Sequence, residues 1–219
     1  MRKFFALLLS VLIFCGMLSG CANASQTYAN YVQAVMDCTY HGNTTQYVAL
    51  TGASQQEAYR IYNAEVESVA TLICQKFDVD TEYLLPEVYD EYILFAKELL
   101  KTIDYQVESN FKLNDTYQVT LSTQPPDFWD IAFTYVENAY ISEFLPRFAK
   151  IDETDSTQYG ATMTSWGKKV LEVLNQHLSE VTPQEKKYLT IQIQADPQGH
   201  YTVSKQKWNT VDKFLLGLE

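Results

Sequence analysis

The chain has 219 residues, of which 16 are Lys or Arg and 27 are Asp or Glu, and its formal net charge is −11 at pH 7. A hydrophobic content of 47% is too high for a disordered chain, and the acidic balance excludes a nucleic-acid binder that depends on phosphate contacts. A chain of this size buries about 70% of its unfolded surface, enough for one core or two small ones.

Residues 1–20 have the layout of a secretory signal peptide. Arg2 and Lys3 provide a basic start, and the apolar run from Phe4 to Leu18 is too short to span a bilayer comfortably. The run ends in Leu18-Ser19-Gly20-Cys21, which resembles a bacterial lipobox. This resemblance implies cleavage before Cys21 and a lipid on its sulfur, whereas a plain signal peptide cut by a different peptidase is the alternative.

Lipidation would place the mature chain on the outer side of the cell membrane. Residues 21–27 are then a short lipidated tether, and two or three acyl chains give stable anchoring. Anionic head groups repel an acidic protein, so we expect the lipid, and not the surface of the domain, to hold the chain at the membrane.

Helical and strand periods alternate along the mature chain. Residues 26–40, 54–77 and 86–102 are predicted helices, with a turn over 44–51, and Ser54 with Glu57 forms a capping box. A hairpin follows over 105–111 and 117–122, around Asn114-Asp115. The remaining elements are predicted as a helix over 127–148 with Asp127 as N-cap and a bend at Pro146, a helix over 156–181, a second hairpin over 189–195 and 201–203 turning at 197–199, and a terminal helix over 208–216.

These elements predict an α+β fold in one domain over residues 28–219. The apolar faces of the two hairpins need a shared cover, which favours a four-stranded antiparallel sheet with helices on one face and a polar face toward solvent. The helix-helix-hairpin pattern occurs twice, and both an ancient duplication and convergence on common hairpin sequences explain it.

Two motifs near the start of the mature chain carry a resemblance to a known family. Tyr-Val-x-Ala-Val-x-Asp covers residues 31–37, and Tyr-Val-x-Leu-Thr-Gly-Ala-Ser covers residues 47–54. With Glu57-Ala58 and the closing segment around Asp212, they resemble an uncharacterised domain of Gram-positive bacterial lipoproteins. The resemblance implies an exported α+β domain and no assigned activity, so Cys21 is the only functional residue that it supplies.

Cys38 and Cys74 are the remaining cysteines of the mature chain. A disulfide is permitted outside the cytoplasm and would stabilise the fold by roughly 3 to 4 kcal/mol in the chain-entropy model. Two buried free thiols among apolar neighbours are the alternative. The sequence leaves both open.

Metal and cofactor sites are not predicted. His41, His177 and His200 lack the spacing of zinc ligands, and 78–82 lacks the glycine and distal glutamate of a calcium loop. We therefore interpret 78–82 as a solvated turn between helices, and we expect no cofactor and no metal.

Nucleophile and phosphate motifs are also missing. Ser54 and Ser165 do not stand in a strand-to-helix elbow, and Gly160 to Lys168 indicates a helix interior and not a phosphate loop. Most of the 16 tyrosines fall on inward stripes. The sequence does not determine whether the three tryptophans, Trp129, Trp166 and Trp208, face the core or the solvent.

The leading hypothesis is a lipid-anchored, non-enzymatic module outside the cytoplasm. It would bind an envelope protein, peptide or glycan through a helical cleft or the polar sheet face; its oligomeric state is not predicted. The alternative is a cell-envelope hydrolase using Asp127 and Asp130, which needs two carboxyl groups at a defined separation and a pocket that raises one pKa.

Overall fold

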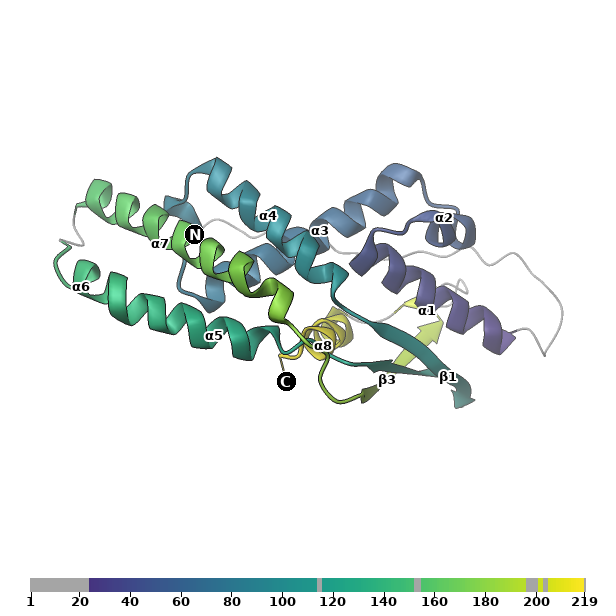
Figure 1. Cartoon of the computed structure of the whole chain (residues 1–219). Helices are drawn as coiled ribbons and strands as arrows, with labels where there is room; N and C mark the ends of the chain where they lie inside the picture. The colour runs from purple at the N-terminus through teal and green to yellow at the C-terminus, as the bar shows by residue number, and fades with distance from the viewer. Residues whose placement is uncertain (1–23, 114–115, 152–154, 196–200, 203–204, 219) are drawn as a thin grey trace. The chain divides into compact units, whose positions relative to one another are not determined.

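The computed structural model describes residues 24–113, 116–151, 155–195, 201–202 and 205–218 (Figure 1). Cys21 and the two predicted turns, at 114–115 and 197–199, lie outside the described residues.

Helices and strands follow the predicted order closely. The first half contains α1 (Ala24–His41), α2 (Thr45–Thr51), α3 (Gln55–Lys76), the 3-10 turn η1 (Thr81–Tyr83), α4 (Pro86–Lys101), β1 (Tyr105–Leu113) and β2 (Thr116–Thr123). The second half contains α5 (Phe128–Ala139), the π-helical turn η2 (Tyr140–Phe144), α6 (Leu145–Phe148), α7 (Ser156–His177), the 3-10 turn η3 (Leu178–Glu180), β3 (Lys187–Ala195), β4 (Tyr201–Thr202) and α8 (Lys205–Leu216).

The fold is a mixture of helices and an antiparallel sheet, which agrees with the α+β prediction. The strands form one sheet in the order β1-β2-β3-β4. The part of the fourth strand that the structure describes is two residues long, and its register pairs Gln194 with Thr202 and Ala195 with Tyr201. Among the described residues the sheet therefore consists mainly of its three long strands.

The described residues separate into two compact units, and the single domain predicted over 28–219 stays a prediction. Of these residues, the first unit takes those within 24–62, 105–122 and 188–212, and the second takes those within 63–104, 123–187 and 213–218. Each unit draws on segments that are distant in sequence. No single cut of the chain separates them, so a scan for linkers could not have found this division.

In the first unit, α1 covers one face of the sheet. Neighbouring strand residues point to opposite faces, and Val119, Leu121, Ile191 and Ile193 are all buried. At one end of α1 the Tyr28 ring contacts Tyr117 of β2, with ring centroids 3.6 Å apart. The predicted apolar face of the hairpins is thus the covered face.

The second unit is helical and has an aromatic core. The buried Trp166 indole of α7 donates through Nε1 to the Phe77 carbonyl at 2.8 Å, and the Tyr92 hydroxyl donates to the Gly167 carbonyl at 2.8 Å. Gly167 permits this close packing, because a Cβ there would lie 2.7 Å from Leu84 Cδ2. The absence of a side chain at position 167 therefore lets α7 pack closely against its neighbours.

One predicted element was wrong. Residues 45–51, expected as a turn, form α2, which ends where Gly52 adopts a φ of 71°. The predicted helix over 127–148 is present as α5, η2 and α6, and the irregularity expected at Pro146 is the π turn η2 just before it, because Pro146 has no N–H to donate to the carbonyl four residues earlier. Helix α1 begins at Ala24, two residues before the predicted helix over 26–40, and the lipidated tether over 21–27 stays a prediction. In the part of the chain that the structure describes, no helix is both long and apolar enough to cross a bilayer.

Candidate functional site

The first polar cluster lies where the end of α1 meets the start of β1. The Tyr105 hydroxyl donates to Asp37 Oδ1 at 2.7 Å and lies 3.4 Å from His41 Nδ1. Gln33 Nε2 donates to the same Asp37 oxygen at 2.8 Å. The His41 and Tyr105 rings are stacked with centroids 5.0 Å apart. A carboxylate, a phenol and an imidazole therefore meet at one point.

A second phenol–carboxylate pair lies beside the first. The Tyr40 hydroxyl donates to Asp212 Oδ1 of α8 at 2.5 Å. The Tyr40 ring meets the Tyr105 ring edge-on, with centroids 6.1 Å apart, and this contact joins the two pairs. Burial raises the pKa of Asp212 to about 6, while the hydrogen bond from Tyr40 acts in the opposite direction. We call the following five residues the Tyr–Asp cluster: Asp37, Tyr40, His41, Tyr105 and Asp212.

The Tyr–Asp cluster has the side chains of an acid–base site, but they form hydrogen bonds with one another. Both carboxylates accept from phenols of neighbouring elements, which is how buried polar groups are normally satisfied. A general acid needs a proton that can reach a substrate. The arrangement best explains how α1, β1 and α8 are held together.

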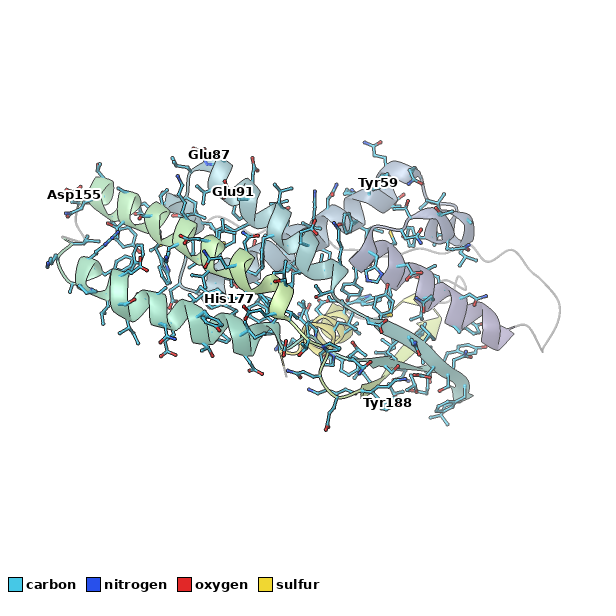
Figure 2. The ribbon with its side chains drawn as sticks, in the orientation of Figure 1. Tyr59, Glu87, Glu91, Asp155, His177 and Tyr188 are labelled. Carbon is cyan, nitrogen blue, oxygen red and sulfur yellow. The ribbon has the colours of Figure 1, made fainter. Side chains whose placement is uncertain are left out.

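The outer face of the sheet is the second candidate region. Ser122 Oγ donates to Glu108 Oε1 at 2.6 Å, and the Thr120 and Thr190 hydroxyls are 3.2 Å apart. Because alternate strand residues share a face, Tyr188 lies on this same side, with 63% of the residue exposed (Figure 2). The Thr120 and Thr190 hydroxyls, the Glu108 carboxylate and the Tyr188 ring thus share a polar face over β1, β2 and β3, whereas Ser122 is buried beneath it.

Asp127 and Asp130, the predicted hydrolase pair, have different surroundings. Both oxygens of Asp127 are used on one residue: Oδ1 accepts from the Thr182 amide at 2.7 Å and Oδ2 from its hydroxyl at 2.6 Å. Asp127 begins α5, as predicted, but its side chain makes no capping bond there. Asp130 is exposed. Asp127 therefore joins the loop at Thr182 to the start of α5, and the surroundings of the two carboxylates do not favour hydrolysis.

Cys38 and Cys74 are separate free thiols in the structure, and both are fully buried. Cys38 Sγ is 3.5 Å from the Ala58 carbonyl oxygen, its hydrogen-bond acceptor. Burial raises the pKa of Cys38 to about 11 and that of Cys74 to about 12. The structure therefore has the arrangement of two inert thiols among apolar neighbours, without the disulfide that was the other alternative.

The two histidines that the structure describes belong to different units. His41 belongs to the Tyr–Asp cluster, whereas His177 at the end of α7 stacks on Tyr135 with ring centroids 3.5 Å apart and lies 3.0 Å from Glu180 Oε1 (Figure 2). His200 lies outside the described residues. Within the described ranges, no three His, Cys, Asp or Glu side chains gather as a metal site requires.

The remaining sequence candidates have structural roles. Asp80 Oδ1 accepts from the Glu82 amide at 3.0 Å and caps η1, while the Ser54 hydroxyl accepts from the Glu57 amide at 3.1 Å. Residues 160–168 lie inside α7, as predicted, and this helix also contains Ser165. Of the tryptophans whose burial the sequence left open, Trp129 and Trp166 are buried and Trp208 is half-buried.

The Tyr–Asp cluster joins residues that are far apart in the sequence. Tyr105 and Asp37 are 68 positions apart, and Tyr40 and Asp212 are 172 positions apart. A spacing rule detects partners only within one element or motif. The one available signal was polarity inside apolar stripes, since Asp37 follows a run of buried residues in α1.

The fold and these clusters define an α+β protein in which the Asp37, Asp127 and Asp212 carboxylates each bond to a residue of another element. Among solved structures it is similar to a candidate lipoprotein, ycdA, of Bacillus subtilis, with a TM-score of 0.50 and 15% sequence identity. The match covers 88% of this chain and 56% of the other, so this chain spans a little over half the length of its neighbour. At this identity the likeness shows a shared fold. No family model and no curated protein matches the chain.

Proposed function

We propose that this chain is a lipid-anchored binding module outside the cytoplasm, with no enzymatic activity of its own. The observation that carries the proposal is the fold shared, over 88% of this chain, with a candidate lipoprotein. The lipobox-like segment ending at Cys21 supports it from the sequence alone. The uncharacterised lipoprotein domain family that the motifs at 31–37 and 47–54 resemble is the finer assignment that we propose.

The anchor is tested by moving the predicted lipid site. We expect the wild-type chain to separate with membranes and Cys21→Ala to lose this association, because a single Cys side chain carries the acyl groups. Cys38→Ala is the matched control, since its thiol is buried and cannot be acylated in the folded protein. A Cys21→Ala protein that is exported and still separates with membranes would contradict the proposal.

The outer sheet face is the surface that we propose for partner binding. Exposed tyrosine rings contribute disproportionately to protein interfaces and also stack on sugar rings. Tyr188 supplies such a ring, and Glu108, Thr120 and Thr190 place hydrogen-bonding groups on the same face. This combination suits an envelope protein, a peptide or a glycan better than it suits an anionic surface.

A photocrosslinking amino acid on intact cells tests this surface. We expect the crosslinker at position 188 to capture one defined envelope component. Tyr59 of α3 is the matched control, because it is also an exposed tyrosine of the first unit, with 48% exposure (Figure 2). Equal capture from positions 59 and 188 would show that the sheet face has no specific role. Co-sedimentation of purified Tyr188→Ala with isolated cell wall then tests the glycan alternative.

A further inference from the structure

The free end of the β1–β2 hairpin carries two apolar side chains that the core does not use. Phe111 is 51% exposed and Leu113 is 52% exposed. Counting by twos along β1, both lie on the face of buried Tyr105, opposite to the face of Glu108. They therefore continue the inward face of the sheet beyond the point where α1 and the core cover it.

This end of the hairpin lies next to the start of α1. At its far end, α1 contacts the beginning of β1 through Asp37, His41 and Tyr105. At its near end, Tyr28 contacts Tyr117, which follows the hairpin turn, with ring centroids 3.6 Å apart. Helix and strand thus run in opposite directions, and Figure 1 shows the arrowhead of β1 at the same end as the first turn of α1.

The predicted anchor lies a short distance along the chain from this end. Ala24, where α1 begins, is three positions after Cys21, and this length of chain reaches about 10 Å at most. Tyr28 is about one helical turn further, roughly 6 Å along the axis. The head-group region of each leaflet is itself roughly 5 to 7 Å deep. A chain held by Cys21 therefore keeps the hairpin end within reach of the bilayer surface.

We infer that Phe111 and Leu113 enter the lipid interface beside the anchor, which fixes the orientation of the first unit on the membrane. This inference rests on the proposed lipidation of Cys21. A protein with a net charge of −11 gains nothing electrostatically from an anionic leaflet, so an apolar contact is the favourable kind. Phe and Leu are also the side chains with which interfacial segments bury themselves in the acyl boundary.

The contact can be measured in the acylated full-length protein reconstituted into vesicles of phosphatidylglycerol and phosphatidylcholine. An environment-sensitive fluorophore is attached to Phe111→Cys or Leu113→Cys, and Leu94→Cys of α4, a residue that is 60% exposed, is the control. Native Cys38 and Cys74 are fully buried and do not compete for the label. We expect a blue shift and quenching by bromolipids at positions 111 and 113, and neither at position 94.

Flotation of the same vesicles separates the two ways in which this inference can fail. If the protein does not float with the vesicles, the lipid anchor is absent, and both the proposed function and the hairpin contact are wrong. If the protein floats but the labels at 111 and 113 behave as the label at 94 does, the anchor stands and the hairpin contact is refuted. Quenching at 111 and 113 in floating vesicles supports the contact.

Discussion

The strongest test of the Tyr–Asp cluster is the replacement of Asp212 by Asn. Burial raises the pKa of Asp212 from 3.8 to about 6, so the folded state binds its proton more tightly than the unfolded state does. The stabilisation from this proton is complete below the unfolded pKa of 3.8 and is lost as the pH rises through about 6. At neutral pH the folded protein therefore holds a carboxylate that burial disfavours.

The shift sets the size of the effect. One pKa unit corresponds to about 1.4 kcal/mol, so the full difference between the folded and unfolded values is about 3 kcal/mol. Some solvent reaches this half-buried side chain, which reduces the expected gain to about 1–3 kcal/mol. An asparagine cannot ionise, yet its carbonyl oxygen still accepts from Tyr40. Asp212→Asn should therefore unfold less readily than wild type above pH 6.

Urea denaturation of wild type and Asp212→Asn at about pH 4.5 and about pH 7.5 measures this difference. The free energy of unfolding of the variant should exceed that of wild type at the higher pH, and the excess should shrink at the lower pH. Asp90→Asn, an exposed position in α4, controls for the loss of one acidic charge. A variant that is less stable than wild type at the higher pH, or an excess independent of pH, would refute the reasoning.

Three further predictions concern the second unit and the thiols. Gly167→Ala should lower the free energy of unfolding by about 1–3 kcal/mol, because its Cβ would lie 2.7 Å from a leucine methyl group. Gly160→Ala in the same helix is the control, because its Cβ meets only an exposed tyrosine ring at 3.2 Å. Thermal or urea unfolding should show this control to be as stable as wild type or up to about 1 kcal/mol more stable. Asp127→Ala should lower the free energy of unfolding by about 1–3 kcal/mol in the same assay, since two hydrogen bonds to Thr182 are lost. An unchanged free energy of unfolding would indicate that Asp127 has a role other than a structural one. Alkylation should leave Cys38 and Cys74 unmodified in the folded protein at neutral pH and should modify both after denaturation without reductant, and a failure to modify them after denaturation would indicate a disulfide.

Local sequence patterns predicted most of the helices and strands, because the spacing of apolar residues along an element determines which of its faces is buried. The apolar positions expected inside α4 include Val88, Tyr92, Phe95 and Leu99, and all four are buried. The alternation in the hairpins likewise places Val119, Leu121 and Ile191 in the core. A short element gives too few turns for such a stripe, so residues 45–51 were not recognised as helical.

Contacts between residues that are far apart in the chain could not be predicted, because local patterns contain no information on them. Asp127 was expected to cap α5, because the cap pattern is local, but its carboxylate bonds to Thr182, 55 positions away. The Asp37 and Asp212 carboxylates also accept from distant residues, Tyr105 and Tyr40, which lie 68 and 172 positions away. A local rule assigns an acid the nearest suitable role, whereas the folded chain gives it the nearest partner in space.

The Tyr40–Asp212 bond also constrains how the first unit forms. It joins α1 to α8 across 172 positions, and the hairpins that α1 covers lie between them in sequence. Contacts at such separations make folding slow, because loop closure precedes the gain from packing. The first unit is thus complete only when α8 is in place, although the proposed anchor is at the other end of the chain. A hairpin that rests on the membrane beside the anchor would hold α1 and β1 at one surface and shorten the search that α8 must make.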